Sequence, residues 1–279
     1  MARGRGPIDT VTLNRTREAP VATPDTQAFG SRSPGAAAIF GPSSTRPSQH
    51  LRPLAIDTVL FDLDGTLLDT APDLIGAANT LLLEQGRPQQ AAGLFRPVVS
   101  HGSAAMIARS FGLALEDPDM ETLRERFLTL YRERVSRLTR PFAGIPDLLE
   151  RIEGRGVRWG VVTNKPAWLT EPLLRDLGLA DRAACIVSGD TVACRKPDPR
   201  PVAYACELLG IAPHQAVVVG DARRDVNAGR LAGTATIVAL FGYICAEDEP
   251  TRWGADGLIG HPSELLRWLA PTANQPGGI

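Results

Sequence analysis

The sequence predicts an α/β fold with a doubly wound, mainly parallel sheet and a small all-helical domain inserted into it. From Ile56 onward, short apolar and β-branched segments alternate with amphipathic segments. One connection, between Asp62 and Arg158, is too long for a simple crossover and is helical in period. The 279 residues, 43% of them hydrophobic, suffice for one core domain with an insertion.

Residues 1–53 are predicted to form a disordered extension. They are rich in Pro, Gly, Ser, Thr and Arg and show neither helical nor alternating apolar period. The arginine-rich, acid-poor composition superficially resembles an organelle transit peptide, but scattered prolines oppose the amphipathic helix that such peptides use. A start codon assigned too far upstream explains the segment equally well.

The strands of the sheet are predicted from runs of Val, Ile and Leu with few charges, a pattern typical of strands buried on both faces. Each run precedes a helix-like segment. We therefore assign residues 54–72 and 141–279 to a Rossmann-like core. The predicted strands lie near residues 57–62, 158–163, 184–188, 216–220 and 235–240.

Residues 73–140 are predicted to form the helical cap, with hinges near residues 70–72 and 140–143. Two apolar faces recur with helical spacing. The first comprises Leu74, Ala77, Ala78, Leu81 and Leu82, and the second Leu123, Phe127, Leu130, Tyr131, Val135 and Leu138. The charges of the last cap helix are interpreted as a solvated face. They are Glu121, Arg124, Arg126, Arg132, Glu133, Arg134 and Arg137.

Composition argues against several classes of partner. The net charge is −1 and the arginines are interspersed with acidic residues, so a basic nucleic-acid-binding stripe is not expected. The four cysteines form no CxxC pair, which indicates reduced thiols in a cytoplasmic protein. Apolar runs fall well short of the roughly 20 residues of a membrane span. The expected partner is a small molecule, and the chain is expected to be a monomer or homodimer.

The segment FDLDGT, beginning at Phe61, is the first candidate site. Asp62 and Asp64 leave the end of a predicted buried strand on the same side, and Gly65 lets the backbone turn away. Two carboxylates this close repel each other unless a divalent cation bridges them or one holds a proton. A turn with an ordinary helix cap is the alternative interpretation.

The scarcity of lysine indicates a second candidate functional residue. Only Lys165 and Lys196 are lysine among 30 basic residues. A compact ammonium placed against a phosphate or carboxylate is not replaceable by a planar guanidinium. We interpret Lys196 as a functional residue and Lys165 as a surface residue retained by chance.

Polar residues also follow two further predicted strands: Thr163 and Asn164 after one, and Asp221 and Asp225 after another. Each pair alone is compatible with a helix cap or a surface ion pair. Ligands of open α/β sheets bind outside the carboxyl ends of the strands. Four such loops in sequence order, with Lys196 in the third, therefore predict one shared site.

With these motifs the chain resembles the haloacid dehalogenase superfamily of phosphohydrolases, over essentially all of Ile56 to Leu269. It is most similar to bacterial phosphoglycolate phosphatases and N-acetylmuramic acid 6-phosphate phosphatases. The similar stretches are DLDGTLLDTAPDL from Asp62, GVVTNKP from Gly160, RKPDPRP from Arg195 and GDARRDVNAGRLAG from Gly220.

The resemblance implies a role for each motif residue. Asp62 would be the nucleophile and Asp64 the general acid/base. Thr163 and the Asn164 backbone amide would bind the phosphoryl group, and Lys196 would neutralise its charge.

The resemblance also implies a Mg²⁺ cofactor held by the Asp62 carboxylate, the Asp64 carbonyl and Asp221. Asp225 would orient Lys196 or a metal-bound water. Since a phosphate dianion repels an anionic nucleophile, a bridging cation and a lysine fit the physics of the attack.

The expected activity is Mg²⁺-dependent hydrolysis of 2-phosphoglycolate through an aspartyl-phosphate. The alternatives are a phosphatase for N-acetylmuramic acid 6-phosphate or another sugar phosphate, or a phosphomutase. Schiff-base phosphonate cleavage is disfavoured because residues 73–140 contain no lysine. Dehalogenation would leave Asp64 unexplained, and a non-catalytic scaffold would not keep every motif residue. His101, in a loop that departs from the phosphoglycolate phosphatase pattern, is a candidate substrate contact.

Overall fold

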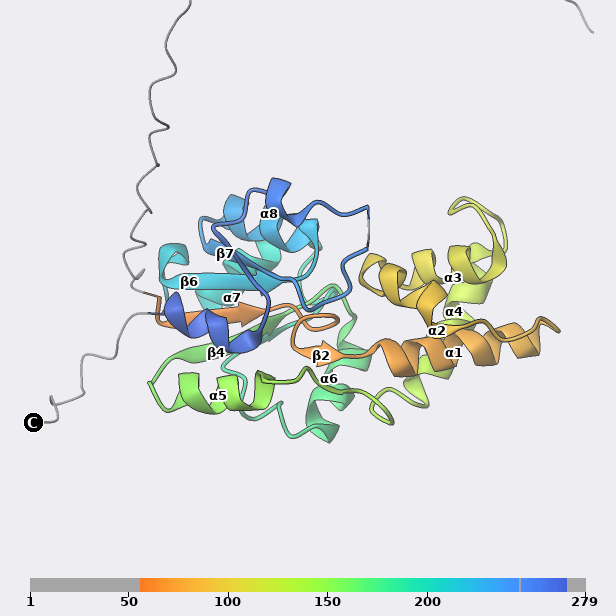
Figure 1. The fold of residues 1–279 in the computed structure, drawn as a ribbon, viewed down its shortest axis with the longest axis horizontal. Helices are drawn as coiled ribbons and strands as arrows, with labels where there is room; N and C mark the ends of the chain where they lie inside the picture. The colour runs from red at the N-terminus through yellow and green to blue at the C-terminus, as the bar shows by residue number, and fades with distance from the viewer. Residues whose placement is uncertain (1–55, 246, 270–279) are drawn as a thin grey trace, which may run out of the picture. The chain divides into compact units, whose positions relative to one another are not determined.

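The computed structural model describes residues 56–245 and 247–269, so the predicted disorder of residues 1–53 lies outside the described residues. A parallel six-stranded sheet with the order β5-β4-β1-β6-β7-β8 forms the core (Figure 1). Its strands are β1 (Thr58–Phe61), β4 (Arg158–Val162), β5 (Ile186–Val187), β6 (Ala216–Gly220), β7 (Ala235–Ala239) and β8 (Gly257–Ile259).

The predicted fold class and the five predicted strands are confirmed, each within a few residues of its predicted bounds. The strand β8 was not predicted. It has only three residues, begins with glycine and leaves Leu258 exposed, so it shows neither a buried apolar run nor a clear alternation. A short edge strand of this kind is recognised only by its pairing with β7.

Helices connect the strands, and all of the longer helices lie where amphipathic segments were predicted. They are α1 (Ala71–Glu84), α2 (Ala92–Phe95), α3 (Ser103–Phe111), α4 (Met120–Arg132), α5 (Ile145–Glu153), α6 (Ala167–Asp176), α7 (Arg200–Leu209) and α8 (Arg223–Ala232). Four 3₁₀ helices are η1 (Arg96–His101), η2 (Pro213–Gln215), η3 (Pro250–Arg252) and η4 (Pro262–Arg267). Within the described part of the chain, no helix is long and apolar enough to span a bilayer.

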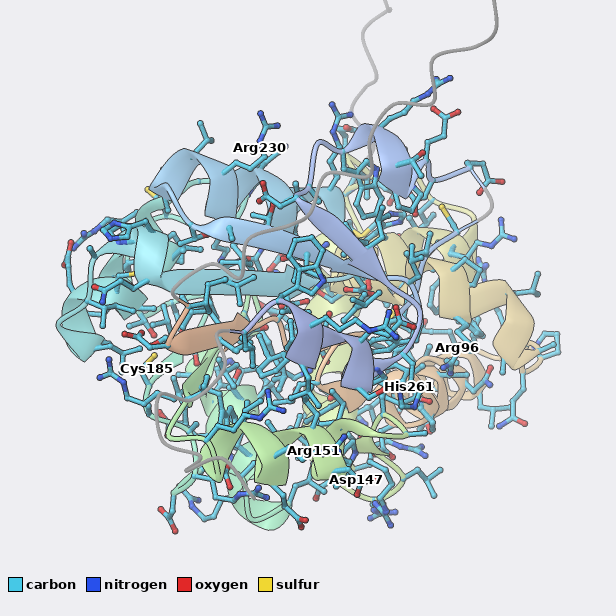
Figure 2. The ribbon with its side chains drawn as sticks, turned by 60° about the vertical axis from the view of Figure 1, so that its left-hand side comes forward. Arg96, Asp147, Arg151, Cys185, Arg230 and His261 are labelled. Carbon is cyan, nitrogen blue, oxygen red and sulfur yellow. The ribbon has the colours of Figure 1, made fainter. Side chains whose placement is uncertain are left out.

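Alternate residues of β1 pack on opposite faces of the sheet, as a strand requires. Val59 and Phe61 join the apolar cluster that includes α5 and η4, whereas Leu60 joins the cluster of α7 and α8. The charged residues Asp147 and Arg151 lie on the exposed face of α5 (Figure 2). Because both faces of the central strands are covered by helices, the apolar runs of the sequence are continuous rather than alternating.

The helices α1 to α4 lie between β2 (Leu68–Asp69) and β3 (Arg140–Pro141), which pair antiparallel. The predicted apolar face of α1 is buried, and so are Phe127, Leu130 and Tyr131 of α4. Leu138 is exposed, contrary to the predicted face, because α4 ends at Arg132 and the helical period stops there. We refer to residues 71–139 as the helical insertion.

The buried Asp73 carboxylate binds the C-terminal end of the insertion. Asp73, in the first turn of α1, is fully buried, and its Oδ2 accepts hydrogen bonds from the Leu138 and Thr139 amides and the Thr139 hydroxyl at 2.8, 2.8 and 2.9 Å. Arg134 Nε lies 3.6 Å from Asp73 Oδ1. Arg134 therefore does not belong to the predicted solvated face.

Replacing Asp73 with alanine should lower the free energy of unfolding by about 3 kcal/mol, because two buried amides and Arg134 lose their acceptor. Urea denaturation measures the loss. The exposed carboxylate Glu150 provides the control, since Glu150→Ala should change stability by less than about 0.5 kcal/mol. Equal effects of the two substitutions would contradict this account of the anchor.

Candidate active site

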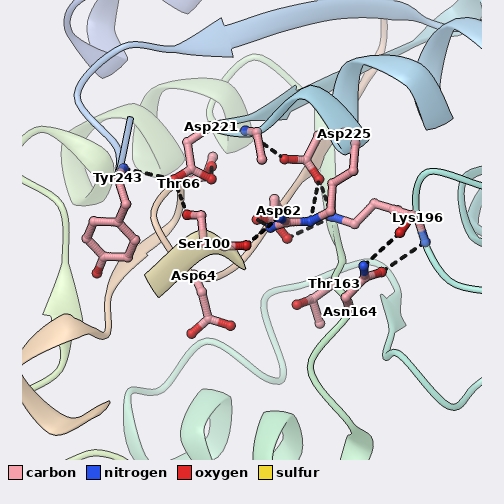
Figure 3. A network of polar contacts seen from close by, with 12 residues as sticks. Asp62, Asp64, Thr66, Ser100, Thr163, Asn164, Lys196, Asp221, Asp225 and Tyr243 are labelled. Carbon is pink, nitrogen blue, oxygen red and sulfur yellow. Dashed lines mark hydrogen bonds and ion pairs between the residues drawn. The ribbon is translucent and has the colours of Figure 1, made fainter. Parts of the chain in front are cut away.

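The ends of three neighbouring strands bring the predicted polar residues together. Asp62 follows β1, Thr163 follows β4 and Asp221 follows β6, and β1 lies between β4 and β6 in the sheet. The chain leaves β1 toward β4 on one side and returns to β6 on the other, so this edge is the topological switch point where α/β sheets bind ligands. Figure 3 shows the convergent side chains.

Lys196 links two buried carboxylates. Its Nζ donates to Asp62 Oδ1 at 2.7 Å and to the Val162 carbonyl at 2.6 Å, and it lies 2.8 Å from Asp225 Oδ1. All three side chains are almost fully buried. The sequence analysis expected Asp225 to orient Lys196 or a metal-bound water. The Asp225 carboxylate lies against Lys196, and the role of each residue remains a prediction.

The two aspartates beside Lys196 have opposite pKa shifts. Burial raises the pKa of Asp62 above its ordinary value, although the Lys196 ammonium opposes the rise. Burial acts on Asp225 in the same direction, but Lys196, Arg224 and the hydrogen bond from the Ala222 amide hold the pKa of Asp225 below its ordinary value. The surroundings of Asp225 thus favour its ionised form, whereas burial disfavours the ionised form of Asp62.

Asp221 is held by both the core and the helical insertion. Its Oδ2 accepts from the Ser100 hydroxyl at 2.6 Å and the Tyr243 amide at 2.9 Å. Burial and the neighbouring charges of Asp62 and Asp225 raise the pKa of Asp221 to about 7. The backbone of Gly65 has φ +93°, and a Cβ there would lie 2.1 Å from Asp221 Oδ2. Glycine at this turn is therefore required for the carboxylate to reach its place.

These carboxylates fit a hard cation. Asp62, Asp221 and Asp225 each offer an oxygen atom within 4.8 Å of the others. Among the described residues, the buried Asp62 Oδ2 accepts no hydrogen bond, and the Arg224 Nη2 cation lies 3.8 Å from this oxygen. A buried carboxylate oxygen without a partner is costly, and oxygen ligands are those that Mg²⁺ prefers. The family resemblance implied Asp62, Asp221 and the Asp64 carbonyl for this site, and the carboxylate cluster contains the first two together with Asp225.

Asp64 lies apart from that cluster (Figure 3). Its Oδ1 accepts from the Thr70 hydroxyl at 2.6 Å and from Lys165 Nζ at 2.7 Å. The interpretation of Lys165 as a chance surface residue is wrong. The lysine side chain is buried, and its ammonium also lies 4.5 Å from the centre of the Tyr131 ring.

Asn164 positions Lys196 through the backbone. The Asn164 side chain donates to the Lys196 carbonyl at 2.8 Å and accepts from the Lys196 amide at 2.9 Å. Thr163 is buried next to it, and its hydroxyl accepts from the Lys165 amide at 3.1 Å. The sequence predicted that this pair contacts a phosphoryl group, but it gave no indication that the Asn164 side chain supports the lysine loop.

A cavity of about 540 Å³ opens over these residues. Asp62, Asp64 and Thr163 line its floor, while the helical insertion contributes His101 and Arg124. His101 is exposed, and its predicted role as a substrate contact remains a prediction. Arg124 lines the cavity and is 30% exposed, so its interpretation as part of a solvated face stays a prediction.

Sequence reasoning missed two residues that join the insertion to the acidic cluster. Ser100 from η1 donates to Asp221, and its carbonyl accepts from Arg224 Nη1. Tyr243 contributes its amide to Asp221, and its hydroxyl donates to Asp69 and accepts from the Ala71 amide. Neither a lone serine in a loop nor a tyrosine after the last long strand carries a pattern that predicts such contacts.

Comparison with known proteins identifies the family. The sequence profile described as "Haloacid dehalogenase-like hydrolase" matches residues 59–239, which is more than half of the chain. The chain belongs to the haloacid dehalogenase-like hydrolase family. The predicted resemblance is thereby confirmed.

Two relatives in this family are similar over most of the chain. An N-acetylmuramic acid 6-phosphate phosphatase from Pseudomonas aeruginosa is 46% identical over 216 residues, covering 77% of this chain and 96% of the relative. A phosphoglycolate phosphatase from Xanthomonas campestris pv. campestris is 44% identical over 218 residues, covering 78% of this chain and 97% of the relative.

Solved structures of the family share the fold. A crystal structure from Haemophilus somnus, described as a predicted phosphoglycolate phosphatase, has a TM-score of 0.68 and 25% identity, covering 76% of this chain and 97% of that one. A structure of CbbY from Rhodobacter sphaeroides in complex with phosphate has a TM-score of 0.61 and 26% identity, covering 75% of this chain and 96% of the CbbY chain.

Replacing Lys196 with methionine should lower the free energy of unfolding by about 3–5 kcal/mol, because Asp62 and Asp225 would remain buried without their cation. Adding Asp225→Asn to this variant should recover part of the loss. Urea denaturation of wild type, the two single variants and the double variant measures the coupling free energy between Lys196 and Asp225. Arg200→Met, which breaks an exposed ion pair with Glu207, is the control and should cost at most about 1 kcal/mol. Strictly additive losses for Lys196 and Asp225 would contradict the network.

Proposed function

We propose that this protein is a Mg²⁺-dependent phosphomonoesterase that works through an aspartyl-phosphate on Asp62. The observation that carries the proposal is the environment of Asp62, which lines the cavity. One carboxylate oxygen is held by Lys196, and the other is buried and has no hydrogen-bond donor in the described part of the chain. The names of the two relatives, both phosphatases, support the same activity.

The proposed Mg²⁺ site is formed by Asp62 and Asp221, together with the Asp64 carbonyl implied by the family resemblance. When bound, the cation would neutralise phosphoryl oxygens and favour the ionised forms of the carboxylates around it. Asp225, the nearby anion with the lowered pKa, would keep Lys196 charged and in place. The lysine ammonium then offsets the remaining negative charge of the phosphoryl group.

In the first step, an oxygen of Asp62 attacks phosphorus and the bond from phosphorus to the ester oxygen breaks. Asp64 donates a proton to the departing alkoxide, so the products are an alcohol and the aspartyl-phosphate. Lys165 and Thr70 hold the Asp64 carboxylate within the cavity wall. Thr163 and the Asn164 amide bind the transferred phosphoryl group.

In the second step, the ionised Asp64 takes a proton from a water molecule that attacks the same phosphorus. The bond from phosphorus to Asp62 breaks, and inorganic phosphate leaves with the carboxylate restored. Two such steps replace one very slow hydrolysis. Residues 73–140 act in this proposal as a cap that covers the reaction from water, and residues 54–72 and 141–279 form the catalytic core.

The substrate is a small phosphorylated metabolite. The sequence favoured 2-phosphoglycolate, and the Xanthomonas relative carries that name. A cavity of about 540 Å³ is within the range of about 300–1,000 Å³ that holds drug-sized ligands, and it exceeds what a two-carbon acid needs. This observation favours the second candidate, a sugar phosphate such as N-acetylmuramic acid 6-phosphate, which the Pseudomonas relative is named for.

Asp62→Asn should reduce Mg²⁺-dependent phosphate release by at least about 10³-fold, because an amide oxygen does not form the aspartyl-phosphate. A phosphate assay with both candidate substrates measures the loss. Asp147→Asn, on the exposed face of α5, is the matched control and should retain full release. Equal release by wild type and Asp62→Asn would exclude the proposed nucleophile, and isomerisation without release would indicate a phosphomutase.

Removing Mg²⁺ with a chelator should stop phosphate release and lower the melting temperature. Mg²⁺ at about 100 times its Kd should add about 2.7 kcal/mol of stability to wild type. Asp221→Asn should abolish this increase, whereas Asp147→Asn should keep it. The same Mg²⁺-induced rise in melting temperature in Asp221→Asn would show that the cation binds elsewhere.

A further inference from the structure

The cavity extends beyond the residues that the proposed reaction uses. Trp168, at the start of α6, lines it and remains 45% exposed, which is unusual for so large an aromatic side chain. Arg124 of α4 lines the same cavity from the helical insertion. These two residues come from the core and the insertion, respectively, and neither contacts the acidic cluster in any hydrogen bond or ion pair of the described residues.

Arg124 keeps part of its guanidinium available. Its Nε donates to the Ser103 hydroxyl at 3.0 Å, and its Nη1 lies 2.8 Å from Glu121 Oε1, which is on the exposed side of α4. Nη2 has no hydrogen-bond partner among the described residues. The side chain is 30% exposed, so Nη2 can donate a charge-assisted hydrogen bond to one oxygen of a carboxylate.

Two of the other cations that line the cavity are paired with carboxylates. Lys165 pairs with Asp64, and Arg224 lies 3.8 Å from Asp62 and 3.9 Å from Asp225. Arg195 also lines the cavity, and its Nε donates to the Gly189 carbonyl. A carboxylate bound beside Lys165 would lie next to the acid that donates the proton. Arg195 directly precedes Lys196, the lysine of the proposed phosphoryl site, so a second anion remote from the phosphate is assigned to Arg124 of the helical insertion.

We propose that Trp168 and Arg124 form a distal subsite that binds the part of the substrate remote from the phosphate. The C–H face of a sugar ring packs on the Trp168 indole by dispersion, and a carboxylate on the far side of that ring pairs with Arg124. This inference rests on the proposed phosphatase function and specifies its substrate class. That class is a hexose-sized phosphate monoester with a carboxylate separated from the phosphate by the ring.

The carboxylate half of the proposal is tested with two sugar phosphates. N-Acetylmuramic acid 6-phosphate and N-acetylglucosamine 6-phosphate share the ring and the phosphate, but only the first carries a carboxylate. Arg124→Met should lower the ratio of kcat/KM for the first to that for the second by about tenfold. Arg132→Met, an exposed arginine of the same helix, is the control and should keep the wild-type ratio. An unchanged ratio in Arg124→Met would overturn the carboxylate contact.

The proposed packing of the sugar ring on the indole is tested by substituting Trp168. Trp168→Leu should raise KM for both sugar phosphates by about tenfold relative to KM for 2-phosphoglycolate, which has no ring to pack on the indole. Trp168→Phe should recover much of the loss, because an aromatic face remains. Equal changes for all three substrates would indicate a structural role for Trp168 and overturn the subsite.

Binding measurements separate the subsite from the chemistry. Calorimetry of N-acetylmuramic acid 6-phosphate on Asp62→Asn, with and without Arg124→Met, reports affinity without turnover. If wild type releases no phosphate from any substrate but Arg124→Met weakens binding about tenfold, the subsite stands and the phosphatase proposal fails. If phosphate is released but Arg124→Met leaves affinity unchanged, the phosphatase stands and the subsite fails. Failure of the sugar phosphate to bind would also overturn the subsite.

Discussion

The repulsion among buried carboxylates at one edge of the sheet is the constraint on which the rest of the site depends. Asp62, Asp221 and Asp225 each place an oxygen within 4.8 Å of the others, where desolvation and like charge oppose ionisation. Lys196 relieves only part of this repulsion, since it contacts Asp62 and Asp225 but not Asp221. The site therefore favours additional positive charge, which is what the proposed cation would supply.

The fold supplies this concentration of charge through topology rather than through a single motif. The central strand β1 lies between β4 and β6, so three loops distant in sequence meet where those strands end. Glycines make the close approach possible, because a Cβ at Gly65 or Gly242 would collide with the Asp221 side chain. The lysine that balances the cluster arrives from a fourth loop, which the Asn164 side chain holds by two hydrogen bonds. Substitution of Gly65, Gly242 or Asn164 would therefore displace the charged side chains without removing any of them.

The sequence predicted what depends on strand periodicity and strand ends, and it failed where contacts depend on how separate segments pack. Asp62, Thr163 and Asp221 were found because each directly follows an apolar strand. Lys165 was misjudged because its position in the chain gives no measure of burial, and its partners Asp64 and Tyr131 come from two other segments. The roles of Ser100 and Tyr243 were not predicted for the same reason.

The hydrogen bond from Ser100 to Asp221 has a consequence for how tightly the proposed cation would bind. The Ser100 hydroxyl and any ion bound at Asp221 share one carboxylate, so the placement of η1 and the occupancy of that carboxylate are thermodynamically linked. The free energy by which docking of η1 changes the affinity for the ion equals the free energy by which the ion changes the docking of η1. A movement of the helical insertion that breaks this hydrogen bond would therefore change the dissociation constant of the ion.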